Sequence, residues 1–214
     1  MTTKAYSIIF LLLVLFFTCT SCEEEWTEEQ FAHYISFKAP LDADGVTPIY
    51  VRYRTDVVTP YKLPLIVSGS TVNDKNMSVK VAVDPDTLAN LNIERFQSRT
   101  DLYYEELNPG YFSIQETVDM KAGEDVSLMN IDFNLSGIDL VDKWILPITI
   151  VDSPTGDYIA NPRKNYSKAL LRVMPFNDYS GTYSGTALKT YLRGSEDGAW
   201  KRSACSLVIK TLEP

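Results

Sequence analysis

The fold is decided by the stretch Met77-Ser78-Val79-Lys80-Val81-Ala82-Val83, in which the odd-numbered residues are all apolar. Two of the three residues between them, Ser78 and Lys80, are polar. Successive side chains of a β-strand point to opposite faces, so a period of two predicts a strand with one buried face. This is the cleanest alternation in the chain, and it predicts a half-buried strand.

Similar runs recur between residues 31 and 175, separated by turn-forming Gly, Pro, Asn and Asp. They lie at 31–37, 49–54, 63–67, 111–114, 117–120, 129–135, 144–151 and 169–173. Long helical patterns are absent from the sequence. About eight or nine short strands at this spacing predict an all-β fold, an immunoglobulin-like antiparallel β-sandwich over residues 31–175.

One short helix is expected as an insertion in this β pattern. Asp84 is suited to cap it, because a carboxylate accepts hydrogen bonds from free N–H groups, and Pro85 fits the first helical position. Residues near helical spacing follow, namely Leu88, Leu91 and Ile93. Calcium binding is the alternative role for Asp84-Pro85-Asp86, but the Asp-x-Asp-x-Asp-Gly order of a loop site is missing. We therefore expect a helix in a crossover and no metal site.

Residues 1–21 have the composition of a secretory signal peptide. Lys4 precedes an apolar run at 8–17, which is about half as long as the roughly 20 residues of a membrane-spanning helix. Small and polar residues then lead to Cys22. The segment resembles a bacterial lipoprotein signal, which leaves Cys22 as the acylated first residue of the mature chain. Cys19 is the rival acceptor, disfavoured by the bulky Phe17 beside it.

Residues 22–30 are expected to form an acidic tether between the lipid and the first domain. Glu23-Glu24-Glu25 resembles the export tag of surface-exposed lipoproteins in glycan-foraging Gram-negative anaerobes. Several acyl chains, such as palmitate, hold a protein stably at a membrane, whereas one chain binds only marginally. We therefore expect a location on the outer membrane, exposed at the cell surface. The alternative is an ordinary secretory signal followed by a solvated acidic linker.

The composition argues against several classes of partner and site. The 214 residues carry a formal charge of −8, which argues against nucleic acid and against anionic lipid, since both require clusters of Lys and Arg. After removal of the signal only Cys22 and Cys205 remain, so neither a disulfide framework nor a cysteine zinc site is expected. No cofactor is expected.

A domain boundary is predicted near residue 176. Small and aromatic residues alternate at 177–186, as they do in strands of barrels and meanders, and residues 199–211 have the pattern of a partner strand. Two strands cannot hold a core alone. We interpret residues 176–214 as the beginning of a second, truncated β-rich domain; a hairpin folded against the first domain is the alternative.

Five short motifs occur in a defined order between Tyr61 and Met174. They are Leu63-Pro64-Leu65-Ile66-Val67-Ser68-Gly69-Ser70, Val79-Lys80-Val81-Ala82-Val83-Asp84-Pro85-Asp86, Leu107-Asn108-Pro109-Gly110-Tyr111-Phe112-Ser113, Lys121-Ala122-Gly123-Glu124 and Trp144-Ile145-Leu146-Pro147-Ile148-Thr149-Ile150. This order resembles a family of bacterial surface-lipoprotein domains of uncharacterised function. The domain stands in front of endo-β-N-acetylglucosaminidase-like and adhesin-like proteins of glycan-utilisation loci, and residues 177–186 resemble the start of its usual C-terminal partner. The resemblance implies an immunoglobulin-like fold and a cell-surface glycan context, and it supplies no catalytic residues.

Groups for catalysis are sparse in the sequence. His33 is the only histidine, and it alternates with apolar residues, which favours packing over a catalytic triad or a metal site. Acidic residues are plentiful, but pairs of carboxylates arise by chance in any acidic chain. We therefore expect no enzymatic activity.

Aromatic side chains are the candidates for glycan contacts. Tyr103 and Tyr104 lie in a polar segment and are the preferred surface candidates, together with Trp200, whereas Trp144 lies in an apolar run and is expected in the core. The leading hypothesis is a non-catalytic glycan-binding or adhesion module in polysaccharide or glycoprotein utilisation. Two alternatives remain: a structural spacer or assembly domain without a ligand, and a glycoside hydrolase.

Overall fold

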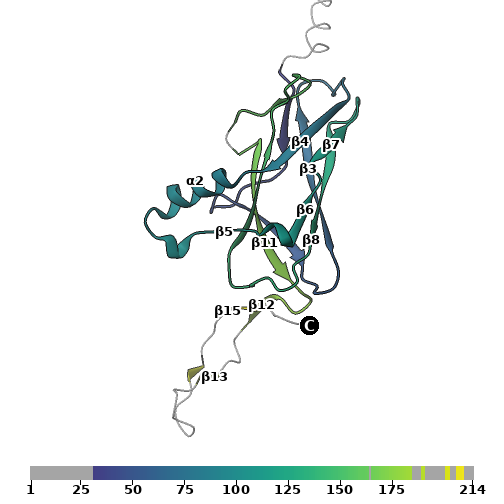
Figure 1. Cartoon of the computed structure of the whole chain (residues 1–214). Coiled ribbons are helices and arrows are strands. Elements are labelled where there is room, and N and C mark those ends of the chain that lie inside the picture. Colours follow the sequence, from purple (N-terminus) through teal and green to yellow (C-terminus); the bar gives the residue numbers. More distant parts are fainter. Residues whose placement is uncertain (1–30, 164, 185–188, 191–200, 203–205, 210–214) are drawn as a thin grey trace, which may run out of the picture.

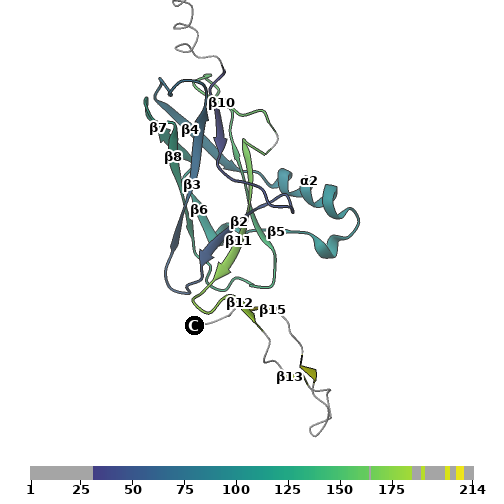
Figure 2. The ribbon, with the colours of Figure 1, turned by 180° about the vertical axis from the view of Figure 1, so that it is seen from behind.

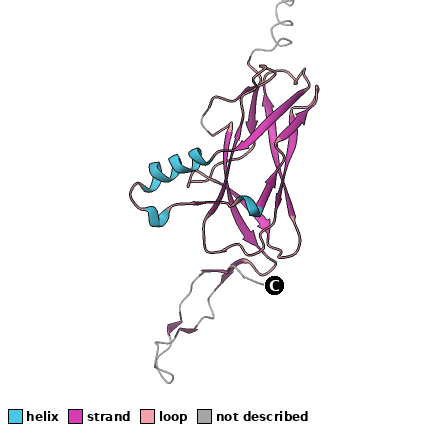
Figure 3. Cartoon of the chain, viewed as in Figure 1, coloured by secondary structure: helices cyan, strands magenta, loops and turns pink. Residues whose placement is uncertain are grey.

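Two β-sheets packed face to face form the body of the protein, with one helix on the outside of the second sheet (Figure 1 and Figure 3). The computed structural model describes residues 31–163, 165–184, 189–190, 201–202 and 206–209. Cys22, Trp200 and Cys205 lie outside these residues. The predicted all-β sandwich with one inserted helix is confirmed.

The first sheet has the strand order β10-β1-β3-β8-β6, and the second has the order β2-β11-β9-β4-β7, with β5 paired to β9. The strands of the first sheet are β1 (Tyr34–Phe37), β3 (Thr59–Ser68), β6 (Phe112–Ile114), β8 (Val126–Phe133) and β10 (Ile159–Ala160). The second sheet contains β2 (Thr47–Arg52), β4 (Met77–Val83), β5 (Glu105–Glu106), β7 (Thr117–Met120), β9 (Trp144–Ile150) and β11 (Lys168–Phe176). The helical elements are α2 (Pro85–Phe96) and the short 3-10 helices η1 (Thr100–Leu102) and η2 (Pro109–Tyr111).

The strand order matches the immunoglobulin pattern. β1-β3-β8-β6 corresponds to the strands A, B, E and D of that fold, and β4-β9-β11 corresponds to C, F and G. Most pairs are antiparallel, as predicted, but β1 with β10, β2 with β11 and β5 with β9 are parallel. Residues 38–46 carry the chain from the first sheet to the second. There β2 pairs in parallel with β11 and becomes the edge strand of the second sheet.

One extended segment closes a side of the sandwich by changing sheets. β6 pairs with β8, and the Gln115 amide still donates to the Asn130 carbonyl, 3.0 Å away. One residue later the Glu116 carbonyl accepts from the Val81 amide at 2.9 Å, and β7 continues along β4. Strands that switch sheets in this way join the two layers of a sandwich at a corner.

The alternating stretch that predicted the fold is β4, an inner strand of the second sheet (Figure 2). Met77, Val79 and Val81 are buried, whereas Ser78 and Lys80 are exposed. The three apolar side chains join the main core between the sheets, to which β3, β8, β9 and β11 also contribute. Each such apolar side chain contributes about 1.5–3 kcal/mol when it is fully buried.

Helix α2 begins as the sequence predicted. Asp84 caps it, accepting hydrogen bonds from the Thr87 amide at 3.4 Å and the Thr87 hydroxyl at 2.6 Å, and Pro85 occupies the first turn. The predicted apolar face is partly wrong, because Ile93 is 59% exposed. Asn92, four residues after Leu88, lies on the buried face instead, as the 3.6-residue period requires.

The buried face of α2 forms a second, smaller core with the outer side of the second sheet. Leu88 packs with Val46, Ile145 and Leu170 in this cluster, which we call the minor core; its further members are Tyr104, Leu91 and Phe96. Asn92 is satisfied there, since its Nδ2 donates to the Tyr104 carbonyl at 3.0 Å and its Oδ1 accepts from the Tyr104 amide at 2.9 Å. This double hydrogen bond fixes the helix to the chain that returns to β5.

A second tie joins the start of α2 to β11. The Lys168 ammonium donates to Asp84 Oδ2 at 2.7 Å and to Thr87 Oγ1 at 2.8 Å. Burial by itself raises the pKa of Asp84, but the hydrogen bonds from Lys168 and Thr87 outweigh it and hold the pKa below its ordinary value.

Asn73 ties two connections together at one end of the sandwich. Its side chain is buried, and its Nδ2 donates to the carbonyls of Lys75, Lys121 and Glu124 at 2.9, 2.9 and 3.3 Å. Its Oδ1 accepts from the Lys75 amide at 3.1 Å, and its own amide donates to Asp125 at 2.9 Å. One asparagine therefore joins the β3–β4 connection to the β7–β8 turn.

Beyond the sandwich the chain forms a separate ladder. β12 (Gly181–Ser184) pairs with β15 (Ser206–Ile209), and β13 (Lys189–Thr190) pairs with β14 (Lys201–Arg202). The pairing expected between 177–186 and 199–211 is thus present, while the extent of a second domain stays a prediction. Within the described part of the chain, no helix has the length and apolar character needed to cross a membrane.

We expect Asn73→Ala to lower the free energy of unfolding by about 2–3 kcal/mol, because three carbonyls lose a buried donor. Urea denaturation followed by circular dichroism measures this change. Asn134→Ala is the matched control, because Asn134 is exposed and its stability effect should stay within about 0.5 kcal/mol. Equal stability of the two variants would contradict the role assigned to Asn73.

The Asp84 charge should stabilise the fold only above the pH range in which the carboxyl titrates. Its pKa is lower in the folded state than the roughly 3.9 of an unfolded chain, so the stabilisation is present at neutral pH and is lost as pH falls through the folded pKa. Asp84→Asn keeps a capping side chain, so its deficit against the wild type should shrink between about pH 5 and pH 2. Asp84→Ala should lose about 1 kcal/mol more, since it also removes the cap. A deficit of Asp84→Asn that does not change with pH would argue against the charge effect.

Candidate functional site

The structure places the two predicted sugar-binding tyrosines around the end of α2. Tyr104 is only 5% exposed, so its expected surface position is wrong. Its ring lies in the minor core, edge-on to Phe96 with centroids 5.5 Å apart. Burial, and to a smaller extent the Asp44 charge, raise the pKa of the Tyr104 hydroxyl. The polar neighbours of Tyr104 gave no sign of this burial, which arises when the chain folds back under α2.

Tyr103 is partly exposed, but its hydroxyl already has a structural partner. It donates to the Gln97 carbonyl at 2.7 Å, and the ring lies 6.2 Å from that of Phe96. Tyr103 and Tyr104 together therefore anchor the end of α2. The core position expected for Trp144 is confirmed in part: it packs against the main core, while its indole N–H donates to the Asp139 carbonyl at 2.6 Å.

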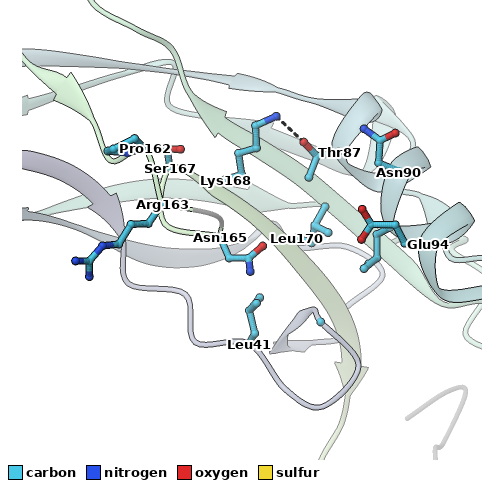
Figure 4. Close-up of a pocket in the computed structure, with 12 residues that line it drawn as sticks. Leu41, Thr87, Asn90, Glu94, Pro162, Arg163, Asn165, Ser167, Lys168 and Leu170 are labelled. Carbon is cyan, nitrogen blue, oxygen red and sulfur yellow. Dashed lines mark hydrogen bonds between the residues drawn. The ribbon is translucent and has the colours of Figure 1, made fainter.

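A cleft of about 450 Å³ runs along α2 and is the candidate binding site (Figure 4). We call it the α2 cleft. The loop before β2, the helix and the segment that enters β11 line it with Leu41, Gly45, Thr87, Asn90, Leu91, Glu94, Pro162, Arg163, Asn165, Ser167, Lys168 and Leu170. Its volume lies within the roughly 300–1,000 Å³ of small-molecule sites.

The helical wall presents polar groups in a row. Thr87, Asn90 and Glu94 are three and four residues apart, so they share one face of α2 and follow one another along the cleft (Figure 4). The Thr87 hydroxyl is held by Asp84 and Lys168. The exposed Asn90 amide offers both a donor and an acceptor to a ligand.

The opposite wall includes Asn165 and the residues that lead from it into β11. Asn165 adopts the left-handed region with φ of 69°, a conformation that asparagine tolerates better than most residues. The Tyr166 amide donates to the Arg163 carbonyl at 3.2 Å, and the Tyr166 carbonyl accepts from the Phe37 amide at 2.8 Å. Ser167 directly precedes β11 and Lys168 begins it, while Arg163 points away from the helix (Figure 4).

The lining of the cleft combines apolar and hydrogen-bonding side chains. Leu41, Leu91 and Leu170 supply apolar surface, and other lining residues supply amide, hydroxyl and carboxylate groups. In the described residues no group of three or more His, Cys, Asp and Glu side chains is placed to hold a metal ion. The arrangement suits non-covalent binding of a polar molecule. Sequence reasoning missed it because its walls come from three separate segments.

Comparisons with known proteins relate the chain to Bacteroides proteins. A multidomain protein including DUF1735 from Bacteroides ovatus is 44% identical, with a TM-score of 0.69 over 84% of this chain and 58% of that chain. An auxiliary nutrient binding protein from Bacteroides thetaiotaomicron is 41% identical, with a TM-score of 0.62 over 84% of this chain and 60% of that one. A protein of unknown function from Bacteroides ovatus is 35% identical, with a TM-score of 0.68 over 84% and 56%. The chain thus spans less than two thirds of the length of these relatives.

Two family models match successive parts of the sequence. A model described as a domain of unknown function, DUF4973, matches residues 26–154, and a model for a C-terminal domain matches residues 167–208. No curated protein matches the chain. The expectation of an uncharacterised bacterial family is confirmed: the chain belongs to the DUF4973 family.

Proposed function

We propose that the protein is a non-catalytic glycan-binding or adhesion module, anchored by lipid to the outer membrane and exposed at the cell surface. The observation that carries the proposal is the 41% identity to an auxiliary nutrient binding protein of Bacteroides thetaiotaomicron. Binding of a nutrient at the cell surface requires a site and an anchor, and the chain offers a candidate for each.

The α2 cleft is the candidate glycan site. Sugars present many hydroxyl groups, and Asn90, Ser167 and Glu94 supply matching donors and acceptors along the two walls. Glu94 is the one carboxylate among the residues that line the cleft, whereas a glycoside hydrolase uses two. This chemistry supports binding without bond cleavage.

The anchor rests on the sequence of residues 1–30. Cys22 is the proposed acylated residue, and Glu23-Glu24-Glu25 the proposed export signal. The described chain enters the sandwich beside β10 and leaves it at the opposite end, beside β12 (Figure 1 and Figure 2). A tether at the entry end therefore directs the exit end away from the membrane. The same path supports the second candidate function, a spacer that holds other domains away from the surface.

Acylation at Cys22 is testable by metabolic labelling. Cys22→Ala should abolish incorporation of radiolabelled palmitate in a Bacteroides host and move the protein out of the membrane fraction, because no other acceptor is used. Cys19→Ala is the matched control and should label normally. Persistent labelling of Cys22→Ala would rule out the proposed anchor.

Glycan binding is testable on an array with the chain from Glu23 onward. If the α2 cleft is the site, Asn90→Ala and Ser167→Ala should each weaken binding by roughly three- to tenfold, which matches the loss of one hydrogen bond. Asn134→Ala should bind as the wild type does, because Asn134 is exposed outside the cleft. Wild-type protein that binds no glycan would instead favour the spacer, and unchanged affinity of both cleft variants would remove the cleft as the site.

A further inference from the structure

A second hollow lies where the sandwich leads into β12, and we call it the junction pocket. It measures about 230 Å³ and takes its walls from residues 52–56, which begin with the last residue of β2, and from residues 177–179, after β11. The Tyr53 amide donates to the Phe176 carbonyl at 2.7 Å, and Arg52 forms an ion pair with Asp178. Both walls are therefore held together by contacts that do not involve a ligand.

The pocket presents two phenol rings. Tyr179 is 64% exposed, and Tyr53 is half-buried against the main core. The turn that carries Tyr179 is pinned, because the Tyr179 amide donates to Asn177 Oδ1 at 2.9 Å and the Asn177 amide donates to the Ser180 hydroxyl at 3.1 Å. A large exposed ring on a fixed turn loses little conformational freedom when a flat ligand packs on it.

Charged groups of both signs stand beside the rings. Arg54 lines the pocket, and its guanidinium forms no hydrogen bond or ion pair with the described residues. Asp56 lies on the same wall and is exposed. Guanidinium and carboxylate groups donate to and accept from hydroxyls, so the pair suits a ligand that carries neutral hydroxyl groups. The carboxylates of Asp56 and Asp178 disfavour a phosphate or another anion.

We propose that the junction pocket binds a single neutral pyranose residue, distinct from the α2 cleft. The choice of a sugar rests on the proposed function. The volume is below the roughly 300–1,000 Å³ of sites for larger molecules, which fits one sugar ring and not an oligosaccharide. The apolar C–H face of the sugar packs on Tyr179, since the face of an aromatic ring is electron-rich, and its hydroxyls reach Arg54 and Asp56.

Nuclear magnetic resonance titration of the chain from Glu23 onward tests the proposal. The probes are the methyl glycosides of mannose, galactose and N-acetylglucosamine, added separately. We expect one of them to shift the amide signals of residues 52–56 and 177–179. Tyr179→Ala and Arg54→Ala should each weaken that binding about tenfold or more, equivalent to about 1.4 kcal/mol. Tyr179→Phe should bind as the wild type does, because the stacking face is kept.

Asn90→Ala, in the α2 cleft, is the control that separates the two sites, and it should leave the shifts at the junction unchanged. Shifts confined to the α2 cleft would overturn the junction site and leave the proposed function standing. No shift at either site with any of the three sugars, combined with no binding on the glycan array, would overturn both. Unchanged affinity of Tyr179→Ala in a protein with a native spectrum would also overturn the junction site.

Discussion

Helix α2 covers the face of β9 and β11 that points away from the main core. The candidate site depends on this packing. Ile145 and Leu170 belong to the minor core and are almost fully buried, although they lie on the side of the sheet away from the main core. Apolar residues on both faces of a sheet need a layer on each side. The helix supplies this layer over part of the sheet, and the α2 cleft lies along its edge.

The sequence carried much of this architecture in its periodicity. The alternation in 77–83 correctly predicted a half-buried strand, and Asp84 with Pro85 correctly predicted where the helix begins. The run at 144–151 correctly predicted the strand β9. The nearly continuous apolar sequence of that strand also indicates burial on both faces, since such strands have unbroken apolar runs. Recognising it would have predicted a cover over Ile145.

Polar residues with structural roles account for most of what the sequence could not predict. Asn73 and Asn92 read as surface residues, yet each satisfies backbone groups from segments distant in the chain. The burial of Tyr104 could not be predicted for the same reason, because it depends on the packing of α2 above this residue. The α2 cleft joins three separate segments of the chain, and the junction pocket joins residues 52–56 to residues 177–179. Periodicity indicates local structure and contains no information about contacts between segments that are distant in the sequence.

The position of the junction pocket has a consequence for how the parts of the chain move together. One wall follows β2 and the other follows β11, at the point where the sandwich passes into β12. The Arg52–Asp178 ion pair and the Tyr53–Phe176 hydrogen bond are two of the contacts that cross this point. The side chains of Arg52 and Asp178 are 42% and 69% exposed, and an ion pair with this much exposure contributes little. A ligand that touches both walls adds to these contacts, so its binding free energy further stabilises the arrangement that they already hold. Under the proposed function, a sugar at the junction would thereby hold the segment that follows β11 against the end of β2.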